Sequence, residues 1–217
     1  MIRLGSKNTF VSFFKARFED FHWNRPSLDG IDFVNISDED NSFLTAEFEE
    51  VEIKEAVWSC EGDKSPGPDG FNFSFIKRVW EVVKADIFAM VDDFYRNGDL
   101  VKGSNASFTV LVPKNGCPQG LGDFRLIPLV GCIEKIIFKL LAVRIKKIIP
   151  YISECQTAFL KGRYIMDGVV IANEIIDQAR KNKDEECFIF KVDFEKAYDS
   201  VNWSFLYMME RMGLCVK

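Results

Sequence analysis

The spacing of apolar residues along the chain predicts a mainly helical protein. Apolar positions recur among charged ones in residues 6–22, where Ser6 or Asn8 is the candidate cap. Further helices are predicted over residues 47–60, 73–97, 131–149, 165–181 and 203–212. Residues 24–41 are rich in Asp, Asn, Pro and Gly, so this stretch is expected to be a linker.

Apolar stripes on these helices identify the expected core. In the second helix, Thr45 is the candidate cap, and the buried face is expected to comprise Val51, Ile53, Val57 and Trp58. The third helix carries a longer stripe, which Gly98 ends; its members are Phe75, Ile76, Val79, Val82, Val83, Ile87, Met90, Val91 and Phe94. Both stripes are assigned to the core, and neither is assigned a functional role.

Two short runs between the helices predict strands. Residues 108–112 are apolar and β-branched, a Gly- and Pro-rich loop follows, and residues 124–129 form a second apolar run. This pattern predicts a β-hairpin with Lys114 and Arg125 near its ends. For Lys114, a plain solvated strand end is an equally good interpretation.

A third apolar run, residues 187–192, ends at a carboxylate. The run predicts a buried strand, and Asp193 follows it where open α/β sheets place their ligands. A carboxylate is also the hard oxygen ligand that Mg²⁺ prefers. The alternative is that Asp193 caps the next helix and Asp199 lies on a solvated face.

The distribution of charge is more informative than the total. The 217 residues have a net charge of −5, which does not suggest nucleic-acid binding. Residues 102–165, however, hold 10 basic and 3 acidic groups. This segment is therefore a candidate phosphate-facing surface, including the basic face of the helix over 131–149. The alternative is that these lysines and arginines only solvate helices.

Cysteine usage and hydropathy indicate an intracellular protein. The six cysteines form no CxxC pair, and the single histidine, His22, cannot complete a zinc site with them. Reduced, buried thiols are therefore expected. No signal peptide and no membrane-spanning run is evident, so we expect a nuclear or cytoplasmic protein that is neither secreted nor membrane-bound.

Four motifs resemble the reverse transcriptases of non-LTR, LINE-type retrotransposons. FKVDFEKAYDSV at residues 190–201 resembles their first catalytic palm motif, and KSPGPDG at residues 64–70 resembles the start of their fingers region. DFR at residues 123–125 and QTAFLKGR at residues 156–163 also match the family. A plain interhelical loop is the alternative for KSPGPDG. The resemblance covers nearly the whole chain, from about Phe13 onward.

The resemblance implies an α+β fold: helix-rich fingers with a short β-hairpin, then the first strand and helix of a right-hand polymerase palm, truncated. It divides the chain into residues 1–62, a helical linker preceding the polymerase; residues 63–185, the fingers; and residues 186–217, an incomplete palm.

The resemblance also implies the chemistry, an RNA-directed DNA polymerase that transfers nucleotides with two Mg²⁺ ions. Asp193 would bind metal as the catalytic carboxylate. Arg125 and Lys114 would bind the triphosphate, the Phe194 carbonyl would add a ligand, and Tyr198 would exclude a ribose 2′-hydroxyl. Lys161 and Arg163 would contact nucleic acid. The implied partners are an RNA template, a DNA primer and deoxynucleoside triphosphates.

Two departures from the family limit this expectation. The hairpin reads FRLIPL where the family has FRPISL, so Leu126 and Pro128 put the nucleotide site in doubt. The 217 residues also lack the family's aromatic-x-Asp-Asp pair, so this chain alone is expected to be inactive. A non-catalytic nucleic-acid-binding or interaction remnant is the alternative function. An aspartate-nucleophile phosphohydrolase is set aside, because Glu195 occupies the position where that chemistry needs Asp.

Overall fold

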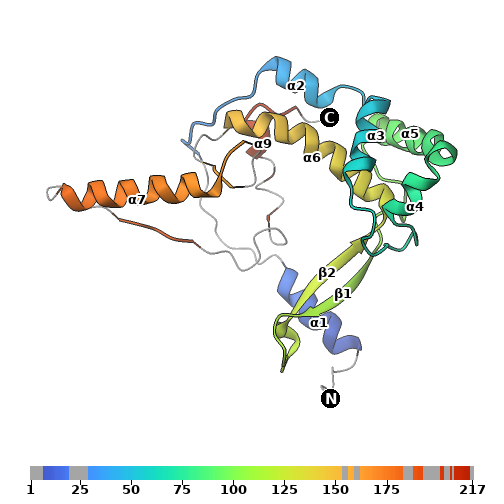
Figure 1. Cartoon of the computed structure of the whole chain (residues 1–217), viewed down its shortest axis with the longest axis horizontal. Coiled ribbons are helices and arrows are strands. Elements are labelled where there is room, and N and C mark those ends of the chain that lie inside the picture. Colours follow the sequence, from blue (N-terminus) through green and yellow to red (C-terminus); the bar gives the residue numbers. More distant parts are fainter. Residues whose placement is uncertain are drawn as a thin grey trace. The chain divides into compact units, whose positions relative to one another are not determined.

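The structure is a computed structural model that describes residues 7–19, 29–152, 156–158, 162–182, 188–192, 201–202, 206 and 208–215. The described residues are mainly helical, with one two-stranded antiparallel sheet (Figure 1). Contacts divide the chain into two compact units, residues 1–22 with 45–144 and 217, and residues 23–44 with 145–216. The division into linker, fingers and palm remains a prediction.

The first unit has a helical core. It is formed by α3 (Glu50–Ser59), α4 (Phe73–Arg78), α5 (Trp80–Asn97) and the first half of α6 (Cys132–Ile152). The side chains that meet there are Ile53, Ala56, Val57, Phe73, Ile76, Trp80, Ile87, Val91, Cys132, Ile136 and Leu140. Each helix contributes residues at helical spacing, so the buried faces follow the apolar periodicity of the sequence.

The predicted helix over 73–97 is two helices. Val79 interrupts it with φ −99° and ψ 16°, and α5 begins at Trp80. Trp80 is buried and packs edge to face against Trp58 and Phe88. The core assignment of Val82 is wrong, because its side chain is 79% exposed, and Phe75 is also exposed. A one-residue break shifts the register of a stripe without disturbing its average period, so periodicity cannot locate it.

Gly98 ends α5 as predicted. Its φ of 73° lies in the left-handed region, and its N–H donates to the Phe94 carbonyl. Glycine adopts this conformation without the steric cost of a Cβ atom.

Two predictions near the start of the chain are wrong. Residues 38–41 belong to a helix, α2 (Asp38–Thr45), because the Asp40 N–H donates to the Ser37 hydroxyl and that hydroxyl donates to the Asp40 carboxylate. Thr45 ends this helix instead of capping the next, and α3 starts after Glu49, whose N–H donates to Glu52.

The buried face of α3 also differs from the expected one. Ile53 and Val57 are buried as predicted, together with Ala56. Val51 and Trp58 are exposed, so their assignment to the buried face is wrong. Trp58 instead contacts the core through a T-shaped contact with Trp80, and its ring lies under the ammonium of Lys54. A large aromatic ring often buries only part of its surface in this way.

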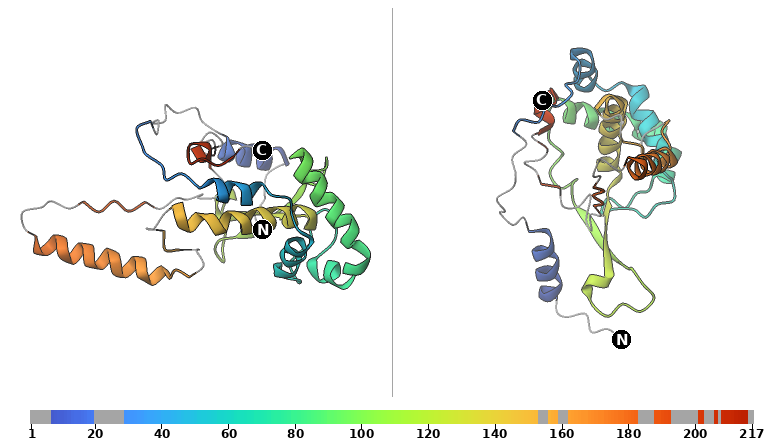
Figure 2. Two further views of the ribbon diagram at one scale, coloured as in Figure 1. Left: turned by 90° about the horizontal axis from the view of Figure 1, so that it is seen from above. Right: turned by 90° about the vertical axis from the view of Figure 1, so that its left-hand side faces the viewer.

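The predicted hairpin is confirmed. β1 (Ser107–Pro113) and β2 (Phe124–Val130) pair antiparallel, with Ser107 opposite Val130 and Pro113 opposite Phe124. A short 3-10 helix, η1 (Leu121–Asp123), leads into β2. The loop end of the hairpin lies away from α3, α4 and α5, and the two strands enter and leave at the helical end (Figures 1 and 2).

Three more helices complete the described elements. α1 (Lys7–Phe18) belongs to the first unit, and α7 (Ile165–Lys181) and α9 (Met208–Arg211) belong to the second. The bounds of α7 are those predicted. Among the described residues, no helix has both the length and the hydropathy to cross a membrane.

The prediction of a buried strand before Asp193 is wrong for its described part. Residues 188–192 form no regular structure, and the side chains of Phe188 and Phe190 are 89% and 90% exposed. A strand needs a neighbouring backbone to complete its ladder, and the only described sheet is the hairpin.

The described cysteines, Cys60, Cys117, Cys132 and Cys215, have free thiols. Burial was predicted for them but holds fully for Cys132 alone, because Cys60 is half-buried and Cys117 and Cys215 are exposed. Residues Cys155 and Cys187 lie outside the described residues.

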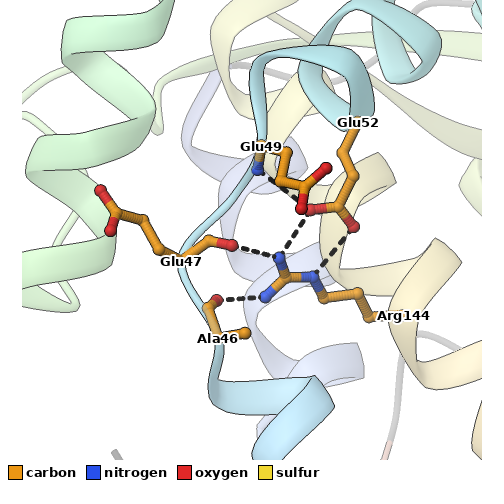
Figure 3. Close-up of polar contacts among 5 residues, drawn as sticks. All are labelled: Ala46, Glu47, Glu49, Glu52 and Arg144. Carbon is orange, nitrogen blue, oxygen red and sulfur yellow. Dashed lines mark hydrogen bonds and ion pairs between the residues drawn. The ribbon is translucent and has the colours of Figure 1, made fainter.

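Arg144 is the buried polar centre of the first unit (Figure 3). Its guanidinium donates to both carboxylate oxygens of Glu52, at 2.7 and 3.3 Å, and to the backbone carbonyls of Ala46 and Glu47. It also lies 4.0 Å from the ring centroid of Phe48. The side chain is 4% exposed, so Arg144, a basic residue of the helix predicted over 131–149, does not lie on the exposed basic face expected for that helix.

Five donors in a planar fork explain why arginine fits this position. One guanidinium satisfies a carboxylate on α3 and two carbonyls in the segment before it, so α6, α3 and residues 46–48 are held together by a single side chain.

Arg144→Ala should lower the free energy of unfolding by about 3–5 kcal/mol, because it leaves a partly buried carboxylate and two carbonyls without their donor. Urea unfolding of the 217-residue chain measures this. Arg144→Lys should recover only part of the loss, since an ammonium cannot reproduce the fork. Arg96→Ala is the matched control: its exposed pair with Asp92 should contribute less than about 1 kcal/mol. Equal losses for Arg144→Ala and Arg96→Ala would contradict the assignment.

Candidate functional site

The register of the hairpin brings two predicted site residues together. Arg125 pairs with Val112, and the Lys114 N–H donates to the Asp123 carbonyl at 2.7 Å, which continues the same ladder one step beyond β1. Side chains two residues apart on a strand share a face, so Lys114 lies on the face of Val112 and Arg125. Lys114 and Arg125 are thus diagonal neighbours, a relation in which Cα atoms lie about 7–8 Å apart.

The same register explains how the strands accommodate two prolines. The bond from the Lys114 N–H to the Asp123 carbonyl marks this position as a hydrogen-bonding one, so by the alternation of an antiparallel ladder every second pair from there, including Val112 with Arg125, is a hydrogen-bonded pair. The pairs Pro113–Phe124 and Thr109–Pro128 fall between them. Proline lacks an N–H, and at these positions the partner strand requires none. Pro128 therefore does not disrupt the hairpin.

The loop beside the two cations is held by Asp123. Its carboxylate accepts from the N–H groups of Gln119, at 2.7 Å, and Gly120, at 3.0 Å. These two donors, with a smaller contribution from the charge of Lys114, hold the pKa of Asp123 below its ordinary value. The carboxylate opposite Lys114 is thus engaged with loop amides, and the side chains of Lys114 and Arg125 are both exposed.

The two faces of the hairpin have different surroundings. On the face opposite the cations, Thr109 and Leu126 line a hollow of about 610 Å³ together with Phe10 and Phe14 of α1. The face of Lys114 and Arg125 carries a row of exposed apolar side chains, Phe108, Val110, Val112 and Ile127. The cations therefore stand at the end of an open, apolar strip.

The KSPGPDG loop anchors the other end of the hairpin. Gly67 lies so close to the end of β2 that a Cβ atom there would come within 2.4 Å of the Val130 carbonyl carbon. Two residues on, the Asp69 carboxylate accepts from the Cys132 N–H at the start of α6 and from the Phe71 N–H at 3.3 Å. A residue far away in sequence thus caps α6, whose first N–H groups have no partner within the helix.

Cys132 adds a second link to this junction. Its thiol donates to the Phe71 carbonyl at 3.2 Å. Burial, with a smaller effect from the charge of Asp69, raises the pKa of Cys132 to about 11, so the thiol stays protonated and remains a donor at neutral pH. Hydrogen bonds therefore join the loop to the start of α6, and Gly67 lies against the end of β2 at the same junction.

Most of the other predicted site residues are not among those that the structure describes. Asp193, Phe194, Tyr198 and Lys161 lie outside the described residues. Arg163 is described, and its guanidinium donates to the Gln156 carbonyl at 2.6 Å within its own loop. Within the described part of the chain, no group of three or more His, Cys, Asp or Glu side chains is placed to hold a metal ion.

The role of Asp69 was not predicted from the sequence. The glycines and prolines of residues 64–70 indicate a loop with defined turns, but nothing in the pattern points to a partner 63 residues away. An acid between two turn residues is an ordinary turn signal, so only the fold distinguishes this cap from a local one.

Comparison with known proteins identifies similar sequences. Residues 105–212 match the family described as "Reverse transcriptase (RNA-dependent DNA polymerase)". The chain is 26% identical over 156 residues to the Transposon TX1 uncharacterized 149 kDa protein of Xenopus laevis, an alignment that covers 71% of this chain and 12% of that protein.

Two Drosophila melanogaster proteins are also similar. The Retrovirus-related Pol polyprotein from type-2 retrotransposable element R2DM is 26% identical over 143 residues, 66% of this chain and 13% of that protein. The putative 115 kDa protein in type-1 retrotransposable element R1DM is 24% identical over 166 residues, 70% of this chain and 15% of that protein. The chain thus spans only a small part, 12–15%, of the relatives it matches.

Asp69→Ala should remove the exchange protection of the Cys132 amide, since a first-turn N–H of a helix has no other intrahelical acceptor. It should also lower the free energy of unfolding by about 1–2 kcal/mol, the usual contribution of a cap. Hydrogen exchange read by NMR tests the first effect and urea unfolding the second. Asp69→Asn keeps an acceptor and should retain most of the protection, and exposed Asp99→Ala is the control. Unchanged exchange at Cys132 in Asp69→Ala would rule out the cap.

Proposed function

Residues 105–212 of this chain belong to the reverse transcriptase family and are related to proteins of non-LTR retrotransposons, and from this premise we propose that the chain forms the nucleotide-binding fingers and the start of the palm of an RNA-directed DNA polymerase. The observation that carries the proposal is the register of the hairpin, which places Lys114 and Arg125 on one open face beside a fixed loop.

In this proposal the two cations bind the triphosphate of the incoming nucleotide. Arg125 offers a planar fork that matches two phosphate oxygens, and Lys114 adds a point charge next to it. The hydrogen-bonded ladder fixes the backbone of both residues, so little ordering remains to be done when the nucleotide binds. The exposed apolar side chains on the same face, Phe108, Val110, Val112 and Ile127, would contact the less polar part of the nucleotide.

Asp193 is proposed as the metal-binding carboxylate. The divalent ions used by this family, when bound, activate the primer 3′-hydroxyl and neutralise charge on the transferred phosphate. An aspartate oxygen suits Mg²⁺, but one carboxylate is only part of a two-ion ligand set. The Phe194 carbonyl is proposed as a further ligand. Tyr198 is proposed to exclude a ribose 2′-hydroxyl.

The apolar run before Asp193 fits the same proposal. Phe188, Ile189 and Phe190 are exposed here, and such a run is stable as a strand only when neighbouring strands pair with it and cover it. We propose that residues 187–192 become that strand in a complete palm. Lys161 and Arg163 are proposed to contact the backbone of the RNA template or DNA primer.

We propose that these residues supply one portion of a longer protein, and that this longer protein has the polymerase activity and works inside the cell. The second candidate function, a nucleic-acid-binding remnant without chemistry, shares the basic surface but needs no Asp193.

In a protein that joins these residues to a complete palm, Arg125→Ala should raise the KM for deoxynucleoside triphosphates about tenfold to a hundredfold, because a charged bond to phosphate contributes roughly 1.5–3 kcal/mol. The kcat should change less, and Asp193→Ala should abolish synthesis. Primer extension on an RNA template, with nucleotide concentration varied, measures both. Arg96→Ala, an exposed arginine on α5, is the control. Full activity in Asp193→Ala, or an unchanged KM in Arg125→Ala, contradicts the assignment.

The 217-residue chain by itself should not extend a primer, because a lone Asp193 cannot position two metal ions. A primer-extension assay with excess Mg²⁺ tests this, and extension above a no-protein control would show that the ligand set is complete without further sequence. Nucleic-acid binding without synthesis in the joined protein would favour the non-catalytic alternative.

A further inference from the structure

A small cavity lies in the first unit between the start of α3 and the second half of α5. Its volume is about 180 Å³. Among the described residues, none of those assigned above to nucleotide, metal or nucleic-acid binding lines it. The residues that line it also precede residues 105–212, which match the reverse transcriptase family. The polymerase proposal therefore gives this cavity no role.

Three aromatic rings line the cavity. They belong to Phe48, which precedes α3, and to Phe88 and Tyr95 on α5. The rings of Phe48 and Tyr95 meet edge to face with their centroids 6.3 Å apart, and Phe88 packs edge to face against Trp80. Each ring is thus held in place by a neighbouring ring. The face of an aromatic ring carries partial negative charge, so such walls attract cations.

Two carboxylates at the cavity have no partner in the described part of the chain. Glu47 and Glu50 line it, and neither side chain forms a hydrogen bond or an ion pair with a described residue. Figure 3 shows the Glu47 carboxylate pointing away from the guanidinium of Arg144, to which the Glu47 backbone carbonyl is bonded. A third carboxylate, Asp92, pairs with Arg96 at 2.9 Å. The cavity therefore retains two uncompensated negative charges.

The surroundings of the cavity favour a cation as well. Residues 1–62 hold 6 basic and 13 acidic groups, the reverse of the balance in residues 102–165. Ile53 and Val91, both buried, complete the lining with apolar surface, and charges beside apolar surface attract each other more strongly than in open water. These features attract a positive group and repel phosphate, so the cavity is not a site for nucleotides or nucleic acid.

The neighbouring Arg144 shows which cation this chemistry suits. Its guanidinium lies 4.0 Å from the ring centroid of Phe48 and pairs with the Glu52 carboxylate, which balances its charge. The cavity offers the same combination, a ring and a carboxylate, to a second guanidinium. A guanidinium is planar and weakly hydrated, and it can stack on a ring while its N–H groups donate to carboxylates. A trimethylammonium group has no N–H donor and would leave both carboxylates without a hydrogen bond.

We propose that this cavity binds a guanidinium group, which stacks on the aromatic rings and donates hydrogen bonds to Glu47 and Glu50. A volume of about 180 Å³ equals the space of about six water molecules, which admits a guanidinium and the end of its alkyl chain. The group belongs either to an arginine side chain of a partner protein or to a free alkylguanidine, and the chemistry is the same for both. The inference goes beyond the proposed polymerase function and does not depend on it.

The test titrates the isotope-labelled 217-residue chain with propylguanidinium, which reproduces the end of an arginine side chain. NMR follows the amide signals of Phe48 and Tyr95, because a ligand this small binds weakly. Propylurea, which has nearly the same shape without the charge, is the matched ligand control and should bind at least about fivefold more weakly. Signals that do not move with propylguanidinium, or equal binding of propylurea, would overturn the proposal.

Two double variants with the same net charge isolate the carboxylates. Glu47→Gln with Glu50→Gln should weaken propylguanidinium binding about fivefold or more, since hydrogen bonds between charged groups are the strong ones. Glu55→Gln with Asp86→Asn removes two exposed carboxylates of α3 and α5 that do not line the cavity, and it should weaken binding less than about twofold. Circular dichroism confirms that each variant keeps its helix content. Equal losses in the two variants contradict the assignment.

Tyr95 provides the second arm of the test. Tyr95→Leu keeps an apolar side chain but removes the ring, so it should weaken propylguanidinium binding about threefold or more. Tyr95→Phe keeps the ring and should retain most of the affinity. An unchanged affinity in Tyr95→Leu would mean that the carboxylates act without the aromatic walls, and the proposed site would be wrong.

A short peptide with one arginine between glycines distinguishes the two sources of the guanidinium. Binding of the peptide about tenfold or more tighter than propylguanidinium assigns the group to a partner protein, because further contacts then add to the affinity. Equal affinity assigns it to a free alkylguanidine. A peptide with neutral citrulline in place of arginine should bind in neither case, and equal binding of the two peptides would overturn the site. The assay needs neither Arg125 nor Asp193, so its result is independent of the synthesis assay.

Discussion

The buried guanidinium of Arg144 is the constraint on which the first unit depends. A charge removed from water is costly unless every donor is satisfied, and here Glu52 and the carbonyls of Ala46 and Glu47 supply the acceptors. The result is that α6 and α3 can pack in only one relative position. Apolar side chains alone tolerate sliding, whereas a planar fork with fixed acceptors does not.

A second junction, formed by the KSPGPDG loop, connects the packed helices to the hairpin. The KSPGPDG loop leaves the end of α3, touches the end of β2 through Gly67, and caps α6 through Asp69. The strands therefore leave the helical core from a fixed base, which sets the direction of the face that carries Lys114 and Arg125. The KSPGPDG motif, which the sequence identified only as a feature of the family, connects the packed core to the candidate nucleotide site.

The hairpin shows how a departure from a family pattern can be neutral. Proline in a strand is harmful where its missing N–H would have completed the ladder. Pro128 falls opposite Thr109, between two hydrogen-bonded pairs, so the expected disturbance does not arise. Leu126 takes the place of the family's proline and lines the hollow beside α1, where a larger apolar side chain has space. The register of the hairpin determines where both Pro128 and Leu126 lie, and the sequence alone does not show this register.

The sequence by itself determined the local elements: periodicity predicted α7 and the hairpin, Gly98 marked the end of α5, and the motifs identified the reverse transcriptase family. Only the tertiary structure decided which polar residues are buried and which apolar ones are not. Arg144 is buried and Val82 is exposed because burial depends on what each face meets, and that neighbour is distant in sequence. The cap by Asp69 and the shared face of Lys114 and Arg125 follow from the same cause, since pairing and docking, not composition, bring such groups together.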